Sequence, residues 1–238
     1  MRFRRQRGQT VALALAAHPL SAAVMTAALT VAAALSGRSA EECALVAATV
    51  LTGQLTIGWV NDLVDRDRDR QVGRQDRPLA MGWVDPSTVA FATACATLLV
   101  VPLSVANGTA AGLAHLGTVL SLWLYDLWFK RSWLSWLPYA AGFGLLPAFL
   151  SYGGLGGGMH GAPPTVQMTV LAALLGVGVH FLVALPDLVE DKETGLRHLP
   201  LRVALRIGAP RLLWVSLAFT VLVSAGIVVT ALTVGLRQ

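Results

Sequence analysis

Long runs of apolar residues alternate with short polar segments along most of the chain. Seven of these runs have about the length of a bilayer-crossing helix, which needs about 20 predominantly apolar residues. They cover residues 18–35, 44–60, 89–105, 110–129, 134–152, 166–186 and 212–234. The pattern therefore predicts an all-α membrane protein, a bundle of about seven transmembrane helices that forms a single domain over residues 1–238.

Two further segments need a separate interpretation. The apolar piece from Leu199 to Ile207 is interrupted by Arg202 and Arg206 and is too short to cross a bilayer, so it predicts an amphipathic helix lying at the interface. The basic start of the chain, followed by an apolar run, also resembles a signal peptide. The apolar run continues past the usual signal length, which favours an uncleaved first helix.

The composition agrees with a membrane location. Apolar residues make up 55% of the chain and charged residues 13%, whereas an ordinary soluble domain has about 25% charged residues. With a cytoplasmic N-terminus, all basic residues except Arg38 and Arg237 fall on the cytoplasmic side of the seven predicted spans. The net charge of +5 therefore indicates membrane orientation rather than a nucleic-acid partner, and we expect an integral protein of a bacterial-type cytoplasmic membrane.

An acidic cluster follows the second apolar run. If the helix continues, Asp62, Asp65 and Asp69 lie on one face, with Asn61 beside them, while Asp67 is turned about 140° away. Three carboxylates on one face repel each other unless cations lie between them. Mg²⁺ prefers such oxygen ligands and commonly shares them with phosphate, so the cluster predicts a magnesium site.

A second acidic cluster ends the sixth apolar run. Asp187 and Asp191 are one helical turn apart, and they follow the first cluster by four spans, an even number. Both clusters are thus expected on the cytoplasmic side, where they could hold metal ions around one diphosphate. Charge runs after a span are often solvated surface, but two clusters in equivalent positions with helical spacing argue against that interpretation.

These residues resemble the motifs of the UbiA superfamily of intramembrane prenyltransferases. The family's N-D-x-x-D-x-x-x-D motif is matched by Asn61, Asp62, Asp65 and Asp69, and its later D-x-x-x-D motif by Asp187 and Asp191. The flanks agree as well, and the resemblance runs from about His18 to Gly208. The matching flanking residues are Arg74, the sequence Arg77-Pro78-Leu79, the pair Lys130-Arg131, Gly195, and Leu199-Pro200.

The resemblance implies a helical bundle around a central cavity that opens sideways to lipid. Mg²⁺ bound by both motifs would hold a prenyl diphosphate, and a lipophilic acceptor, aromatic or other, would attack the allylic cation formed by ionisation. The metal ligands implied are Asp62, Asp65, Asp69, Asp187 and Asp191. The residues implied in substrate binding are Arg74, Arg77, Lys130 and Arg131 at the diphosphate, with Asn61 supporting the metal site.

The sequence departs from the family pattern at two points. The superfamily commonly has nine spans, whereas seven are predicted here. The family often has a tyrosine four residues before the lysine, but here Asp126 stands four residues before Lys130 and is expected to pair with it or take part in the site. His180, seven residues before Asp187, is expected on the same face, deeper in the membrane, either oriented toward an acceptor or as a structural core histidine.

Other functions use the same metal-binding pattern. Ionisation without an external acceptor would make the protein a terpene cyclase, and a phosphoribosyl diphosphate donor would make it a phosphoribosyl-type transferase. A non-enzymatic divalent-cation transporter is the alternative from another class. Transporter sites usually lie near the membrane midplane, whereas these carboxylates are predicted at one face, which favours an enzyme.

Overall fold

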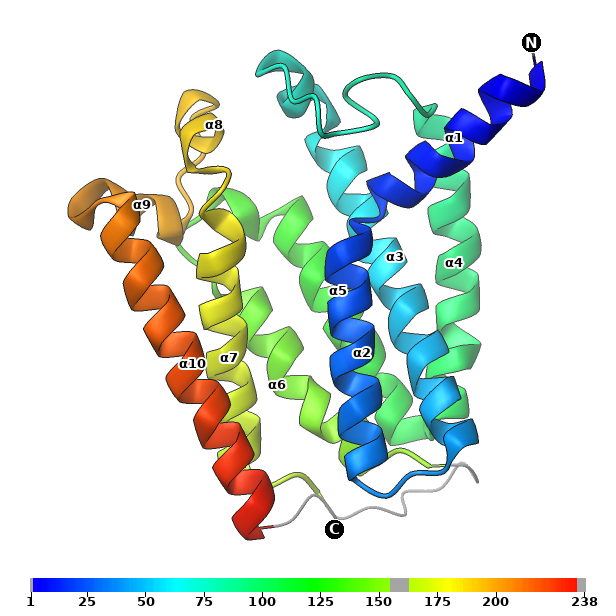
Figure 1. Cartoon of the computed structure of the whole chain (residues 1–238), viewed down its shortest axis with the longest axis vertical. Coiled ribbons are helices and arrows are strands. Elements are labelled where there is room, and N and C mark those ends of the chain that lie inside the picture. Colours follow the sequence, from blue (N-terminus) through cyan, green and yellow to red (C-terminus); the bar gives the residue numbers. More distant parts are fainter. Residues whose placement is uncertain (1, 155–162, 235–238) are drawn as a thin grey trace.

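The computed structural model describes residues 2–154 and 163–234, with side chains described from residue 8 to residue 233 within these ranges. The described chain is helical and contains no strand. Its elements in chain order are α1 (Arg2–Ala16), α2 (Pro19–Leu35), α3 (Ala40–Gln71), α4 (Pro86–Ala106), α5 (Thr109–Leu127), the 3-10 turn η1 (Phe129–Arg131), α6 (Leu137–Ser151), α7 (Val166–Ala184), α8 (Leu188–Glu193), α9 (Leu199–Ile207) and α10 (Ala209–Val234) (Figure 1). The all-helical prediction is therefore confirmed.

The predicted spans each correspond to one long helix. Of these, α3, α4, α7 and α10 are long and apolar enough to cross a bilayer on their own. Residues 8–16 of α1 together with α2 form a fifth candidate span, bent by 57° at the break between them, and α6 is apolar but shorter. The number of seven spans and the cytoplasmic N-terminus remain predictions. The short helix expected over residues 199–207 is present as α9.

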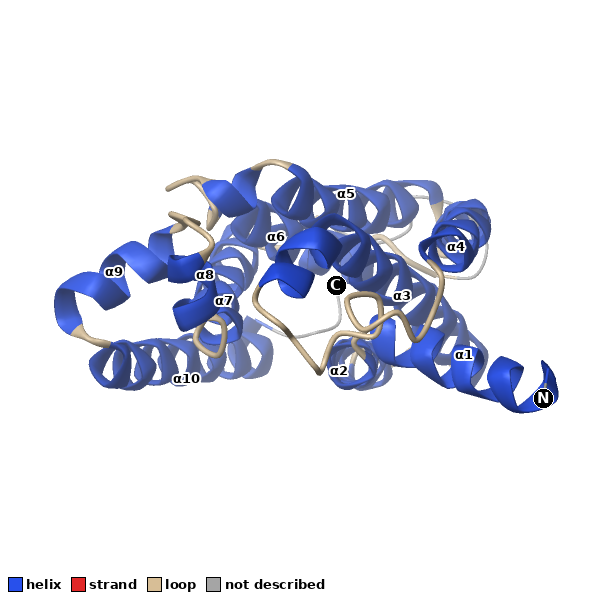
Figure 2. Cartoon of the chain, turned by 90° about the horizontal axis from the view of Figure 1, so that it is seen from above, coloured by secondary structure: helices blue, strands red, loops and turns tan. Residues whose placement is uncertain are grey.

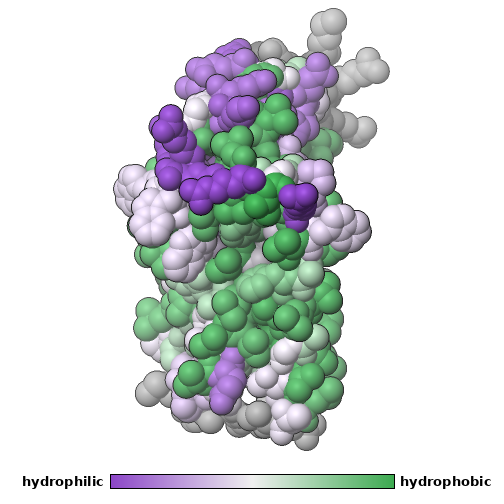
Figure 3. All heavy atoms as spheres, turned by 90° about the vertical axis from the view of Figure 1, so that its left-hand side faces the viewer, coloured by the Kyte–Doolittle hydropathy of each residue, from purple (hydrophilic) through white to green (hydrophobic). Residues whose placement is uncertain are grey.

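The outer surface of the bundle is apolar over most of its height. Figure 3 views the side formed by α9 and α10, where hydrophobic residues fill a broad zone below a cap of hydrophilic residues. On α10, Trp214, Leu222 and Leu232 are among the most exposed large apolar side chains. Apolar exposure of this extent has no partner within the chain, and it is typical of a surface that faces lipid.

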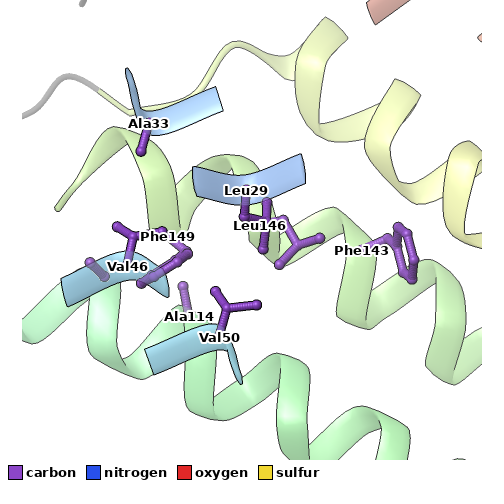
Figure 4. Packing of buried hydrophobic residues seen from close by; sticks show 9 residues of the cluster. Leu29, Ala33, Val46, Val50, Ala114, Phe143, Leu146 and Phe149 are labelled. Atoms are coloured by element: carbon purple, nitrogen blue, oxygen red, sulfur yellow. The ribbon is translucent and has the colours of Figure 1, made fainter. Parts of the chain in front are cut away.

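The helices pack mainly on their neighbours in the chain. α3 lies against α2, α4 and α5, while α6 packs between α5 and α7, and α10 packs on α7 (Figures 1 and 2). A buried cluster joins the lower halves of α2, α3, α5 and α6, where Leu29, Val50, Leu146 and Phe149 are in contact (Figure 4). This core closes the lower end of the bundle and leaves the upper end to polar residues.

Two glycines allow helix backbones to approach closely. A Cβ atom at Gly58 of α3 would lie 2.5 Å from the carbonyl oxygen of Ala17, and one at Gly176 of α7 would lie 2.3 Å from that of Tyr139. Small residues permit such contacts in membrane bundles. Gly58 therefore fixes the α1–α2 junction beside α3, one turn before Asp62.

The break between α1 and α2 is at His18. Its backbone is in the left-handed region, with φ 52° and ψ 62°, and Pro19 begins the next helix. A non-glycine residue in this conformation is uncommon, and a proline restricts the residue before it. The helical α1 was not predicted, and the sharp bend after it directs His18 toward the polar end of α3.

Candidate active site

The two acidic motifs meet at the upper end of the bundle. α3 continues beyond its apolar part, and the side chains of Asp62, Asp65 and Asp69 are all buried, with Asp62 only 1% exposed. Asp67, in contrast, has 85% of its side chain exposed, as its helical position predicts. The motif is therefore one inward face of a continuous helix.

The second motif lies where α7 ends. Asp187 is the residue before α8, and Asp191 lies within α8, with its backbone N–H donating to the carbonyl oxygen of Asp187 at 2.8 Å. The single turn expected between the two aspartates is thus retained, although α7 itself ends at Ala184. Both motifs border one cavity, as described below.

Arg68 links the two motifs. Its Nη2 lies 2.9 Å from Asp65 Oδ2 and 3.6 Å from Asp69 Oδ1, while its Nη1 lies 3.7 Å from Asp191 Oδ1. Sequence reasoning did not single out this arginine. The available signal was its position within the first motif, three residues after Asp65, which places both side chains on one side of the helix.

Arg74 and Arg77 fold back over the acidic face. α3 ends with Gly73 in a left-handed conformation, φ 70°, and the N–H of Arg74 donates to the carbonyl oxygen of Asp69 at 2.9 Å. Arg77 Nη1 then lies 3.2 Å from Asp62 Oδ1, and Arg74 Nη1 lies 2.7 Å from Asp187 Oδ1. Both predicted diphosphate ligands are therefore at the site.

Arg74 is held by a second carboxylate. It donates from Nε and Nη2 to the two oxygens of Asp76, at 2.8 and 2.7 Å. These hydrogen bonds lower the pKa of the Asp76 carboxyl to about 2, and the same contact raises the pKa of Arg74 above its usual value. The guanidinium is thus a permanent charge with a fixed orientation toward Asp187.

Lys130 and Asn61 occupy the α5 side of the site. The Lys130 ammonium contacts Asp65 and lies 5.9 Å from the centre of the Tyr125 ring. Asn61 donates from Nδ2 to Asp126 Oδ1 at 2.7 Å. Asp126 is thus part of the site, but its hydrogen-bond partner is Asn61, whereas Lys130 forms its ion pair with Asp65.

His18 is a further site residue that the sequence did not reveal. Its Nε2 lies 3.1 Å from Asp62 Oδ1 and 2.7 Å from Arg77 Nη1. It is brought there by the bend between α1 and α2. The sequence signal was weak, since it consisted only of a polar residue before a proline at the start of an apolar run.

Below the charged residues lies a cavity of about 220 Å³. Its upper rim includes Asn61, Arg77, Lys130, Asp187 and Asp191. Its deeper lining is mostly apolar and includes Met25, Ile57, Leu122, Phe143, Val179 and Val183. The expected central cavity is therefore present, with charge at one end and hydrocarbon along its walls.

Two predicted residues lie away from this cavity. His180 is fully buried, its Nε2 is 3.0 Å from Ser135 Oγ, and its ring lies against that of Tyr139 at 4.8 Å between centres. It packs behind the cavity wall and does not line the cavity. Arg131 lines a separate depression with Arg68 and Gln71, so the structure places it outside the main cluster.

The donor set of the motifs fits a hard divalent cation. Among the described residues, no three His, Cys, Asp or Glu side chains are arranged closely enough to hold a metal ion, because arginine and lysine side chains contact the carboxylates. Yet Asp62 Oδ2 is buried without a hydrogen-bond partner. Five converging carboxylates and one unsatisfied oxygen are the oxygen ligands that Mg²⁺ prefers.

The fold is similar to that of solved prenyltransferase homologues. A UbiA homolog from Archaeoglobus fulgidus bound to GPP and Mg²⁺ aligns with a TM-score of 0.70 and 18% identity, covering 90% of this chain and 76% of that chain. The same homolog bound to DMAPP and Mg²⁺ aligns with a TM-score of 0.68 and 18% identity, covering 90% of this chain and 75% of that one. A third structure of the homolog has a TM-score of 0.70 and 18% identity, covering 94% and 80% of the two chains.

Sequence comparison gives the family. No curated protein matches the chain. The model of the UbiA prenyltransferase family matches residues 20–237, which include both acidic motifs and the whole cavity lining from α2 to α8. Because this match extends over most of the sequence, the chain belongs to the UbiA prenyltransferase family, as its motifs predicted.

Proposed function

We propose that this protein is an integral-membrane enzyme that transfers a prenyl group from a prenyl diphosphate to a lipophilic acceptor, with Mg²⁺ as cofactor. One observation carries the proposal. Two acidic motifs and three basic side chains converge at one end of a cavity whose deeper walls are apolar. A prenyl diphosphate has the same division, with a multiply charged head and a hydrocarbon tail.

The basic residues have a defined task in this reaction. Arg77 and Lys130 line the cavity, and Arg74 stands beside Asp187, so all three can bind the oxygens of a diphosphate. As the bond between C1 of the prenyl group and oxygen breaks, its electron pair leaves with the diphosphate, and fixed positive charge stabilises that group. Mg²⁺, held by carboxylates of both motifs, would add Lewis-acid stabilisation of the same leaving group.

The apolar walls protect the allylic cation. Leu122, Phe143 and Val179 line the cavity below the charged rim. Excluding water there prevents hydrolysis of a reactive intermediate and leaves the acceptor as the nucleophile. The distribution of basic residues in the sequence supports a cytoplasmic location for the charged end, in a bacterial-type cytoplasmic membrane, within a single domain over residues 1–238.

The test measures diphosphate release from geranyl diphosphate by the full chain in lipid nanodiscs. We expect Asp62→Asn and Asp187→Asn each to reduce Mg²⁺-dependent release by at least about 100-fold, because each removes a proposed metal ligand. Asp67→Asn, on the exposed face of the same helix, is the matched control and keeps the wild-type rate. Full release by both motif variants would overturn the proposal.

Product analysis separates transfer from its alternatives. Mass spectrometry of products from labelled prenyl diphosphates of several lengths, mixed with candidate aromatic acceptors, shows prenylated acceptor if the proposal is right. Cyclic hydrocarbons alone would indicate a terpene cyclase, and turnover of phosphoribosyl diphosphate instead would indicate a phosphoribosyl-type transferase. Mg²⁺ flux into vesicles without any prenyl diphosphate would indicate a transporter.

A further inference from the structure

Asp126 differs from the other carboxylates that line the cavity region. Each of the five motif aspartates lies within ion-pair distance of at least one arginine or lysine. Asp126 is only 6% exposed and lines the same cavity, yet it forms no ion pair within the described part of the chain. Its Oδ1 accepts a hydrogen bond from Asn61, and no residue of the described ranges donates to its Oδ2.

A buried carboxylate with an uncommitted oxygen is energetically unfavourable by itself. Removing such a group from water costs several kcal/mol unless hydrogen-bond donors or opposite charges replace the water, about 1–3 kcal/mol for a polar group alone and more for an ion. The nearby Lys130 already contacts Asp65. The missing donor is therefore best supplied by a molecule within the cavity.

The position of Asp126 matches the reacting end of the prenyl group. Asp126 lies in the last turn of α5, four residues before Lys130, and Asn61 directly precedes the metal-motif Asp62. C1 of a prenyl diphosphate is bonded to a diphosphate oxygen, so it must lie just below the basic residues that hold the diphosphate. An acceptor that attacks C1 therefore lies beside Asp126.

The neighbouring cavity wall is aromatic. The rings of Tyr125 and Tyr139 both line the cavity and pack edge to face, with 4.9 Å between centres. Such rings offer an apolar, flat surface next to the carboxylate, which suits an aromatic acceptor. The cavity thus combines one carboxylate oxygen with an aromatic wall at the level of C1.

We infer that Asp126, held by Asn61, binds the acceptor through an O–H group and takes its proton, so that the acceptor is a phenol or a related hydroxyl compound. This inference rests on the proposed function. The O–H proton moves to Asp126 Oδ2, the acceptor oxygen forms a bond to C1 of the prenyl group, and the C1–O bond to diphosphate breaks with its electron pair leaving on the diphosphate. The proton on Asp126 returns to water at the cytoplasmic end.

The test compares two probes that differ only in the proton. The full chain in nanodiscs is loaded with Mg²⁺ and geranyl thiolodiphosphate, a donor analogue that ionises poorly, and titrated calorimetrically with 2-naphthol and with 2-methoxynaphthalene. We expect the wild type to bind the naphthol about tenfold more tightly, as is typical for one hydrogen bond to a charged group. Asp126→Asn should reduce this preference to about twofold or less, and Asp67→Asn should retain it.

The outcomes distinguish this inference from the proposed function. Equal binding of both probes by the wild type, or an unchanged preference in Asp126→Asn, overturns the role of Asp126. Breaking of the C1–O bond is followed separately, through exchange of labelled oxygen between the bridging and terminal positions of geranyl diphosphate without acceptor. Loss of a phenol preference with exchange intact counts against Asp126 alone, whereas absence of exchange in the wild type counts against the proposed reaction.

Discussion

His198 Nε2 lies 2.7 Å from Asp191 Oδ2, while Nδ1 of the same ring accepts the backbone N–H of Leu201 at 3.2 Å. Because Nδ1 accepts, the ring hydrogen is on Nε2 and is donated to the carboxylate. His198 is also the residue that caps the start of α9. One imidazole thus connects the short helix after the second motif to a carboxylate of that motif.

Two substitutions separate these two roles of His198. His198→Ser retains a side chain that caps a helix but loses the bond to Asp191, whereas His198→Ala loses both. We expect both variants to need about tenfold more Mg²⁺ for half-maximal diphosphate release, since partners of metal ligands commonly contribute this much. Only the alanine variant should also lose about 1 kcal/mol of unfolding free energy. A serine variant with wild-type Mg²⁺ dependence would show that the bond does not position Asp191.

Replacing Arg68 by methionine is expected to make the protein depend on divalent cations for stability. The arginine side chain is mostly buried and compensates Asp65, Asp69 and Asp191, so its loss should destabilise the apo protein by about 3 kcal/mol. Added Mg²⁺ should restore more stability to Arg68→Met than to the wild type. The check is thermal unfolding in detergent with and without Mg²⁺, and an equal Mg²⁺ effect in both proteins would contradict it.

The same glycine-to-alanine change should have opposite effects at two helical positions. At Gly58 the new Cβ would lie 2.5 Å from the backbone of Ala17, so we expect a loss of about 1–3 kcal/mol from overpacking. At Gly144 the nearest atom is 3.4 Å away, on Ala173, so the change should be neutral or stabilising by up to about 1 kcal/mol. Denaturation midpoints measured side by side test this difference, which equal midpoints would refute.

The Arg74–Asp76 pair gives an acid-dependent contribution to stability. The pKa of Asp76 is lowered to about 2 by its hydrogen bonds to Arg74. The stabilisation is therefore complete above the unfolded-state pKa of about 3.9 and is lost as the pH falls toward 2. Because the Asp76 side chain is 62% exposed, we expect less than about 1 kcal/mol. The unfolding free energies of the wild type and Asp76→Asn should differ at pH 6 and converge near pH 2, and a constant difference would exclude this linkage.

The sequence by itself determined the features that depend on local periodicity. Apolar runs of bilayer length predicted the seven long helices, and the interrupted run over residues 199–207 predicted α9. Spacing along a helix placed Asp62, Asp65 and Asp69 on one face and Asp67 on the other, as burial shows. The family likewise followed from the motifs, since these are contiguous patterns in the chain.

Only the tertiary structure decided which polar groups pair. Helical spacing fixes the direction of a side chain relative to its own helix, but not which residue of another helix it meets. Asn61 was expected to support the metal site, yet it bonds Asp126 on α5, and His180 lies behind Tyr139 rather than in the cavity. Arg68 and His18 entered the site because a helix crossing and a backbone bend brought opposite charges and hydrogen-bonding groups together, and these distances depend on packing between segments far apart in the sequence.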